Sequence, residues 1–282
     1  MLDNRIHTFI NLCETMNYRK TAENLSMTQP AVTQHIQGLE HEYGCKLFVY
    51  DKRKLTKTPE AEKLLTCSRS ALYNELDFRK SLSESKPLTM RIGATKTIGN
   101  YEIDGKVSRI LSQGDISLSV IIDNTKNLLH MLDCSELDFA LVEGYFDREK
   151  YSHRLMKKVD FVGICHKNHP FSNKNISIAD LKTERLLIRE KGSGTRAILE
   201  RQLLNLNYSI NQFQNICEIS SFELLKSCLK STNSITFAYK TLADSDPDLS
   251  TFTIAEKLYG EFNFVYLKNT PSETLVEKFI HA

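Results

Sequence analysis

One run of the sequence combines glycines, hydroxyl groups and a guanidinium, which are the groups that bind small anions. It extends from Glu190 to Arg196, between a predicted strand and a predicted helix. Its glycines allow close backbone approach, Ser193 and Thr195 supply hydroxyls, and free N–H groups at a helix start attract negative charge. Arg196 can add a forked pair of donors for a carboxylate or a sulfate-like group. The run alone fits equally well an anion-binding loop and a capped turn with a surface arginine.

The sequence contains no pattern typical of catalysis. There is no G-x-S-x-G nucleophile motif, and no carboxylate pair stands at a recognisable spacing. Cys165, His166 and His169 are near neighbours, but their spacing is poor for a metal site. Ser220 with Glu223 predicts a helix cap. We therefore expect no catalytic residue, no metal and no cofactor.

A second candidate site lies near the N-terminus, on a helix rich in amides. Thr28 is expected to cap this helix, and an apolar stripe is expected to pack inward: Val32, Ile36, Leu39 and Tyr43. The remaining positions at its start and on its opposite face are mostly polar: Gln29, Pro30, Thr33, Gln34, Gln37 and His41. A shorter helix capped by Asn17 and carrying Lys20 precedes it. Such a pair predicts a helix-turn-helix that reads base edges in the major groove.

Basic residues gather directly after this helix. Residues 46–50 and 54–57 predict two short strands, and Lys52 and Arg53 lie in the turn between them. The stretch from Lys46 to Lys57 holds five basic residues, among them Lys54, against Asp51 alone. This hairpin fits either a wing that contacts DNA phosphates or an ordinary solvated loop.

Thr58, Pro59 and Glu60 are typical of a helix start, and the helix should continue to about residue 83. Its narrow apolar seam, which includes Leu72 and Phe78, has no core of its own and favours pairing with a second helix. Beyond the linker at residues 83–87, strands are expected at 88–93, 116–122, 138–142, 161–165, 186–189, 213–219, 235–239 and 262–267. Helices are expected near 107–111, 127–132, 194–206 and 222–229, and from 272 onward. This alternation predicts two open, largely parallel sheets covered by helices.

Length and composition describe an ordinary globular chain. The 282 residues suggest about two domains, and the net charge is only +2. No apolar run is long enough to span a membrane, and no secretory signal precedes the first helix, so we expect a cytoplasmic protein. The seven cysteines are scattered and form no C-x-x-C pair, which is typical of a reducing compartment.

The stretch from Phe9 to Leu65 resembles the LysR-type transcriptional regulators. The resemblance rests above all on the run from Thr21 to Ile36, on Leu39-Glu40-x-x-x-Gly44-x-x-Leu47-Phe48 and on Leu55-Thr56. Farther on, the runs Leu137 to Gly144 and His169-Pro170 resemble motifs that this family has at the corresponding places of its effector domain. The resemblance covers almost the whole chain.

The resemblance implies a winged helix-turn-helix at residues 1–58, a dimerisation helix and hinge at 59–87, and an effector domain at 88–282. That domain would have two Rossmann-like α/β lobes of the periplasmic-binding-protein type, lobe I at 88–160 and 262–282 and lobe II at 161–261. DNA contacts are implied or favoured by charge at Lys20, Thr28, Gln29, Pro30, Thr33, Gln34, Gln37, Lys52, Arg53 and Lys54. Effector contacts are implied at Thr95, Thr97, Ile98, Glu143, Ser193, Gly194, Thr195 and Arg196.

Together these features predict a DNA-binding regulator controlled by a small, anionic effector held between the lobes. Its expected partners are an interrupted palindrome in double-stranded DNA, a second copy or three further copies of itself, and RNA polymerase. Two alternatives stay open. A cysteine-based redox sensor could replace the metabolite site, and the DNA-binding head could be joined to an enzyme, although no catalytic constellation favours the latter.

Overall fold

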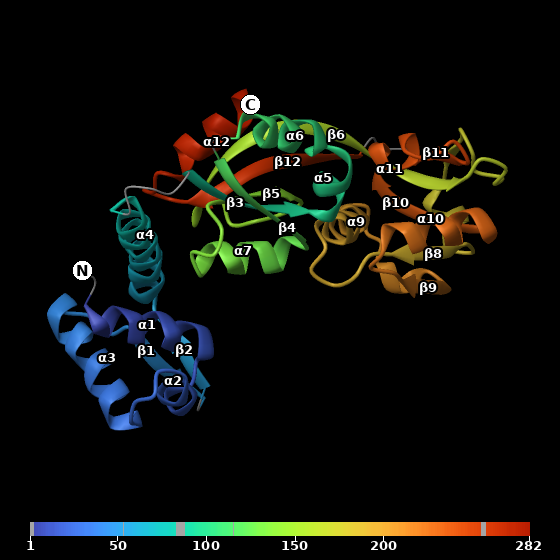
Figure 1. Cartoon of the computed structure of the whole chain (residues 1–282). Helices are drawn as coiled ribbons and strands as arrows, with labels where there is room; N and C mark the ends of the chain where they lie inside the picture. The colour runs from blue at the N-terminus through green and yellow to red at the C-terminus, as the bar shows by residue number, and fades with distance from the viewer. Residues whose placement is uncertain (1–2, 53, 83–87, 115, 255–257) are drawn as a thin grey trace. The chain divides into compact units, whose positions relative to one another are not determined.

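The computed structural model describes residues 3–52, 54–82, 88–114, 116–254 and 258–282 (Figure 1). The chain divides into two compact units. The first comprises residues 1–86, 133–135 and 267–271, and the second comprises residues 87–132, 136–266 and 272–282. In the described residues, no helix combines the length and the apolarity that crossing a membrane requires.

The first unit contains a winged helix-turn-helix. Its elements are α1 (Asn4–Thr15), α2 (Tyr18–Asn24), α3 (Gln29–Tyr43), the antiparallel strands β1 (Phe48–Asp51) and β2 (Lys54–Lys57), and α4 (Pro59–Ser81). The expected caps are confirmed, because the side chains of Asn17, Thr28 and Thr58 each accept a backbone N–H at the start of α2, α3 and α4. These bonds satisfy donors that have no partner inside the helix.

The predicted stripe on α3 packs inward along most of its length. Val32, Ile36 and Leu39 are buried, and the core around α3 is completed by residues of α1, the hairpin and α4, including Phe9 and Leu65. The expectation for Tyr43 is wrong, because its side chain is 50% exposed. It is the last residue of α3, and Gly44 turns the chain away from the core with a φ of +65°.

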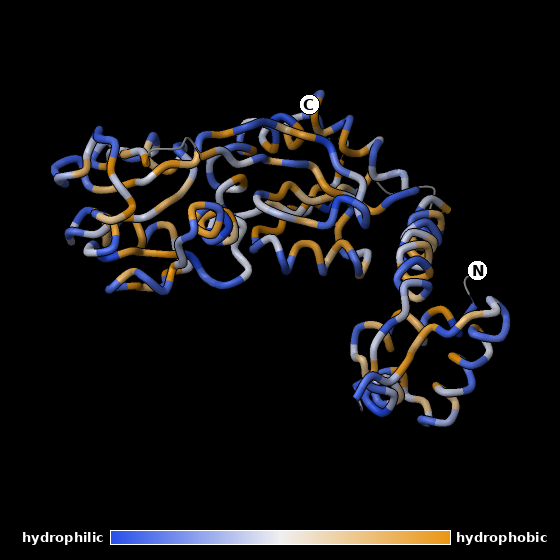
Figure 2. Tube along the Cα trace, turned by 180° about the vertical axis from the view of Figure 1, so that it is seen from behind, coloured by the Kyte–Doolittle hydropathy of each residue, from blue (hydrophilic) through white to orange (hydrophobic). Residues whose placement is uncertain are grey.

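Helix α4 changes character along its length. Figure 2 shows hydrophilic and hydrophobic residues alternating along it. Its first turns contribute Ala61 and Leu65 to the core of the head, whereas Phe78 and Leu82 near its end are 61% and 65% exposed. The end of the predicted seam therefore has no apolar cover from this chain in the described residues.

The second unit is built on a mixed sheet. Its described strands are β3 (Leu88–Thr95), β4 (Ile116–Asp123), β5 (Phe139–Glu143), β6 (Tyr151–His166), β7 (Asn175–Ile176), β8 (Arg185–Ile188), β9 (Asn215–Glu218), β10 (Ser234–Tyr239), β11 (Leu249–Ile254) and β12 (Leu258–Leu267). The main order is β4-β3-β5-β12-β6-β10-β8-β9, and β11 pairs with β6 and β7. Lobe I is the half around β3, β4 and β5, and lobe II is the half around β8, β9 and β10.

Each lobe is internally parallel as predicted, but the expectation of two separate sheets is wrong. Strand β12 pairs antiparallel with β5, and β6 pairs antiparallel with β10 and β11, so these two strands join the lobes. Only residues 161–165 of β6 were expected to be a strand. The first half of β6 carries exposed polar side chains such as His153 and Arg154. Hydrophobic periodicity therefore did not indicate a strand there.

Helices cover the sheet on both faces. They are α5 (Lys96–Tyr101), α6 (Asp104–Gln113), α7 (Thr125–Asp133), α8 (Ile178–Leu181), α9 (Gly194–Asn205), α10 (Phe222–Ser231), α11 (Lys240–Asp244) and α12 (Ser272–His281). In lobe I, α6 and α12 lie on one face and α7 on the other (Figure 1). The terminal helix returns to lobe I as expected, where the ring of Phe279 packs edge-on against Phe139 and Phe264.

Candidate DNA interface and effector cleft

The exposed face of α3 carries most of the residues predicted to read DNA. The Thr28 hydroxyl accepts a hydrogen bond from the backbone N–H of Ala31 at 3.3 Å and thereby defines the helix start. Five of the predicted residues are exposed: Thr28, Gln29, Pro30, Gln34 and Gln37. Thr33 is half-buried, and its hydroxyl donates to the carbonyl of Gln29 at 3.0 Å. Amides on such a face can pair with two atoms of one base edge.

Contacts on the inner side of α3 hold this face in place. The Thr8 hydroxyl on α1 lies 2.8 Å from Nδ1 of His35. At the other end of α3, the carboxylate of Glu40 accepts the backbone N–H of Leu47 at 2.9 Å and pairs with Lys46 at 2.6 Å. The hairpin is therefore tied to the helix that presents the amides.

The described basic residues of the head that were predicted to contact phosphates are exposed. Lys20 is exposed on α2, and its backbone N–H donates to the side chain of Asn17 at 3.0 Å. Lys52 and Lys54 are exposed at the tip of the hairpin. Arg53 lies outside the described residues. Exposed lysines of this kind give attraction that depends on salt and not on base sequence.

Three segments of the second unit meet around Glu143, the last residue of β5. Thr195, at the start of α9, donates its hydroxyl to Oε1 of Glu143 at 2.9 Å. Thr125, at the start of α7, donates to the backbone carbonyl of Glu143 at 3.0 Å. The hydroxyl of Thr97 in α5 also lies beside the carboxyl. The structure thus brings together predicted residues that are 46 to 98 positions apart in the sequence.

The lobes touch through glycines at this point. A Cβ on Gly194 would lie 2.3 Å from the carbonyl oxygen of Glu143, and a Cβ on Gly144 would lie 2.8 Å from the Cα of Gly194. Gly144 also has a φ of +84°, which side chains disfavour. Only glycine at both positions permits this approach of α9 to the end of β5.

Several buried polar atoms around this contact have no well-formed hydrogen bond within the described part of the chain. They are the hydroxyls of Thr95 and Thr97, Oε2 of Glu143 and Nη1 of Arg189. Each such atom costs about 1–3 kcal/mol when it is left without a partner. A polar ligand that reached these atoms would recover part of this cost.

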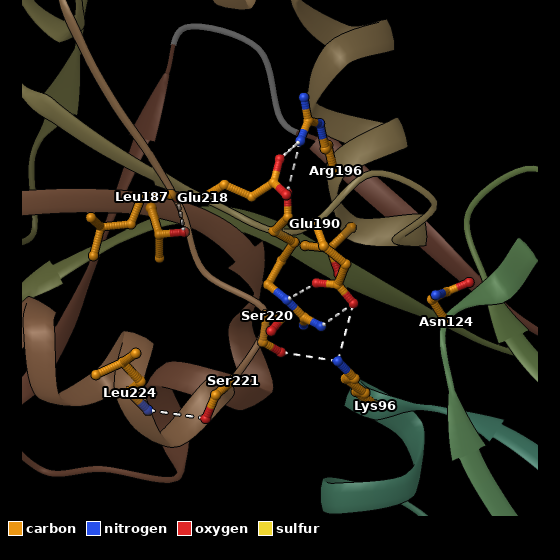
Figure 3. A network of polar contacts seen from close by, with 12 residues as sticks. Lys96, Asn124, Leu187, Glu190, Arg196, Glu218, Ser220, Ser221 and Leu224 are labelled. Atoms are coloured by element: carbon orange, nitrogen blue, oxygen red, sulfur yellow. Dashed lines mark hydrogen bonds and ion pairs between the residues drawn. The ribbon is translucent and has the colours of Figure 1, made fainter. Parts of the chain in front are cut away.

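A cation of lobe I reaches across to lobe II beside this cluster (Figure 3). The Nζ of Lys96 donates to Oε1 of Glu190 at 3.1 Å and to the carbonyl of Ser220 at 3.0 Å. The guanidinium of Arg189 holds the same carboxylate at 3.0 and 3.2 Å. Burial alone would raise the pKa of Glu190, but Arg189 and Lys96 hold it below its ordinary value. Glu190 is therefore a carboxylate held between two cations.

Arg196 does not offer the free fork that its sequence position suggests. Its Nε donates to Glu200 at 2.8 Å, and its Nη1 donates to Glu218 at 2.6 Å and to the carbonyl of Arg189 at 3.1 Å (Figure 3). Two carboxylates of lobe II already occupy this guanidinium. Its observed role is to hold the segment that follows β8 against the end of β9.

The other predicted effector residues fall into two groups. Ser193 and Gly194 are buried at the start of α9, where no side chain caps the helix. Ile98 is fully buried in the hydrophobic core, and its apolar side chain offers no hydrogen bond to a ligand. Residues 96–101 form the helix α5 directly after β3, although no helix was expected there.

The predicted helix cap at Ser220 is wrong, because the side chain of Ser221 accepts the backbone N–H of Leu224 instead.

Sequence reasoning missed Lys96, Arg189 and Glu190 as a group. Lys96 stands between the two predicted threonines, Arg189 directly precedes the glycine-rich run, and Glu190 is the first residue of that run. Their positions were visible, but their pairing across the lobes was not. His169, whose spacing from Cys165 is poor for a metal site, accepts the backbone N–H of Phe171 at its Nδ1, at 3.1 Å.

Comparison with known proteins agrees with this architecture at both ends of the chain. Residues 4–62 match the family described as bacterial regulatory helix-turn-helix protein, lysR family. Residues 84–282 match the LysR substrate binding domain. The chain belongs to the LysR family of transcriptional regulators. The resemblance noted in the sequence is thereby confirmed.

Individual relatives of this LysR-type regulator are distant. The HTH-type transcriptional regulator CysL of Bacillus subtilis is 28% identical over 70% of this chain and 68% of its own length. The HTH-type transcriptional activator CmpR of Synechocystis is 28% identical over 79% of this chain and 73% of its own.

Solved structures support the fold. A variant of full-length OxyR from Pseudomonas aeruginosa aligns with a TM-score of 0.60 at 18% identity, covering 99% of this chain and 93% of that one. The regulatory domain of CcmR from Synechocystis, in complex with 2-PG, aligns with a TM-score of 0.61 at 19% identity. That alignment covers 68% of this chain and 96% of the CcmR chain.

Proposed function

We propose that this LysR-type regulator binds a small anion between its two lobes and that this binding changes its operator affinity or its activation of a promoter. The observation that carries the proposal is the cluster of buried, unsatisfied polar atoms on Thr95, Thr97 and Glu143. It lies next to the start of α9, whose free N–H groups favour negative charge.

The charges between the lobes support an anion. Lys96 of lobe I reaches lobe II, and its present partner is itself a carboxylate, that of Glu190. The CcmR domain with a related fold holds 2-PG. A ligand that touches both lobes would stabilise one arrangement of the lobes, and only such differential affinity can shift a regulator between states.

Calorimetry on the full chain tests this proposal directly. Sulfate, phosphate, acetate and 2-PG serve as anionic probes, and uncharged analogues serve as the comparison. We expect at least one anion to bind and Thr97→Ala to weaken it at least tenfold. Thr183→Ala is the matched control, because Thr183 is exposed and its hydroxyl bonds only a nearby carbonyl in the described residues. Binding of neutral compounds alone would overturn the anionic effector.

For DNA, we propose that Thr28, Gln29, Pro30, Thr33, Gln34 and Gln37 contact the major groove and that Lys20, Lys52, Arg53 and Lys54 contact phosphates. Residues 1–58 would act as the reading head and residues 59–87 as the dimerisation segment. A two-fold dimer through α4 would match an interrupted palindrome. We place this regulator in the cytoplasm, with RNA polymerase as the partner during activation.

The cysteine-based alternative gains less support. Burial raises the pKa of Cys13 and of Cys165 to about 12, so neither thiol ionises readily. Cys67 and Cys217 are exposed. Thiol titration before and after mild oxidant, paired with operator binding, separates the two mechanisms. We expect oxidation of the exposed thiols to leave the response to anions unchanged.

A further inference from the structure

The carboxyl group of Glu143 is buried, and it forms no salt bridge with any residue that the structure describes. The residue is 2% exposed. Its Oε1 accepts the Thr195 hydroxyl at 2.9 Å, whereas its Oε2 is buried without a well-formed hydrogen bond in the described structure. A charged carboxylate in this position would leave one anionic oxygen desolvated.

The charged and titratable groups that face Glu143 do not compensate such a charge. Arg189 is the cation that acts on it, but this guanidinium is hydrogen-bonded to Glu190, whose own charge opposes ionisation. Tyr239 of β10 also faces this region, and it is buried and uncharged. Burial raises the pKa of Glu143, and the hydroxyls of Thr97 and Thr195 together with Arg189 offset this only in part.

We propose that Glu143 recognises the effector as a neutral carboxylic acid whose Oε2–H donates a hydrogen bond to an oxygen of a carboxylate or oxyanion. This inference rests on the proposed anion site and specifies its chemistry. The proton stays on Glu143 throughout binding, so the acid acts as a specificity-determining donor. Deprotonated Glu143 would repel the same ligand.

The surrounding hydroxyls determine which ligands this donor favours. The buried hydroxyls of Thr95 and Thr97 can also donate, so three donors are available to a ligand that brings acceptors only. A fully deprotonated oxyanion or carboxylate satisfies all three. A ligand that presents an ammonium or hydroxyl hydrogen to Glu143 would need the charged carboxylate and is therefore disfavoured.

The proposal predicts that anion affinity falls as the pH rises. If only protonated Glu143 binds, the affinity decreases about tenfold per pH unit above the pKa of this group. Glu143→Gln keeps a hydrogen-bond donor and cannot ionise, so this variant should bind with little pH dependence. Glu149→Gln is the matched control, because Glu149 is exposed and should leave the wild-type pH dependence unchanged.

The test is calorimetry of the full chain with sulfate, which stays fully ionised, at a series of pH values above 4.5, the ordinary pKa of a glutamate carboxyl. Infrared spectroscopy at neutral pH provides a measurement that needs no ligand. A carboxylic-acid C=O band in the wild type that is absent from Glu143→Gln supports the proposal.

The possible outcomes distinguish a failure of the neutral Glu143 donor from a failure of the anion site. If an anion binds and the wild type and Glu143→Gln share one pH dependence, or if the two proteins have the same carboxylic-acid band, the neutral donor is overturned and the anion site stands. If the band is specific to Glu143 but no anion binds at any pH, the anionic effector itself is overturned, and with it the role of Glu143 in recognising it.

Discussion

The Nζ of Lys96 in lobe I lies 3.1 Å from Oε1 of Glu190 in lobe II. The carboxylate of Glu190 thus occupies the position beside Lys96 that an anionic ligand would seek. The chain bridges its own lobes with an ion pair of the type that an effector would form. An incoming anion must compete with Glu190 for this cation.

Removal of this competitor should strengthen anion binding. Because the pair is partly exposed, it is worth roughly 0.5–1 kcal/mol, and we expect Glu190→Gln to bind sulfate about two- to fivefold more tightly. Calorimetry measures the change, with Glu149→Gln as the control for lost charge. Unchanged or weaker binding would mean that Glu190 does not compete with the ligand.

The glycine contact between the lobes should tolerate no side chain. Gly194→Ala places a methyl group 2.3 Å from a backbone oxygen, so we expect a loss of about 1–3 kcal/mol in the free energy of unfolding together with weaker anion binding. Denaturant unfolding provides the first measurement.

Gly105→Ala is the matched control for this substitution. Gly105 lies in α6, and a Cβ there meets nothing within 4 Å. Because alanine has a higher helix propensity than glycine, this substitution should stabilise the protein by up to about 1 kcal/mol. Equal effects of the two substitutions would contradict the close approach of α9 to β5.

The free energy of unfolding should depend on pH in the way that a buried carboxyl group with a raised pKa predicts. The ordinary pKa of Glu143 is 4.5, and burial raises it in the folded state. Between these two values the folded chain binds more protons than the unfolded chain, so stability falls as the pH rises through this window, by up to about 1.4 kcal/mol per unit. Below pH 4.5 this contribution is fully present.

Denaturant unfolding of the wild type and Glu143→Gln at several pH values isolates this contribution. The wild type should lose stability relative to the variant as the pH rises above about 4.5. A constant difference between the two proteins across this range would show that Glu143 ionises as freely in the folded chain as in the unfolded one.

The two parts of the DNA interface should respond differently to substitution. Gln34→Ala removes an exposed amide and should relax the preference at one or two base pairs of a half-site, at a cost of about 1–3 kcal/mol there. Lys52→Ala should weaken all sequences alike and reduce the salt slope by about one unit. Binding across operator variants distinguishes them, and a uniform loss for Gln34→Ala would refute direct readout.

The exposed end of the α4 seam should mediate dimerisation. Phe78→Glu puts a charge on a side chain that is 61% exposed, so the fold of one chain should survive while pairing of two chains fails. Sedimentation should show half the wild-type mass, whereas Lys80→Glu on the same helix should keep it. An unchanged mass for Phe78→Glu would place the interface elsewhere.

Local features of the sequence predicted the head well because its signals act over a few residues. Asn17, Thr28 and Thr58 satisfy donors within three residues of themselves, and Val32, Ile36 and Leu39 repeat at helical spacing. The alternation of strands and helices in the lobes is likewise local, and so was predicted. The polar first half of β6 gave no such signal, and it was missed.

The sequence by itself determined the family, the order of the elements and the residue types available at each loop. Tertiary structure alone decided which of them meet. Thr97, Glu143 and Thr195 come together only when α9 packs against the end of β5. The same packing buries Glu143, pairs Lys96 with Glu190 and leaves Arg196 with Glu200 and Glu218. Burial and charge pairing depend on distances in space between residues far apart in sequence. These distances decide the protonation and the hydrogen-bond partner of each carboxyl group, and the sequence alone does not contain them.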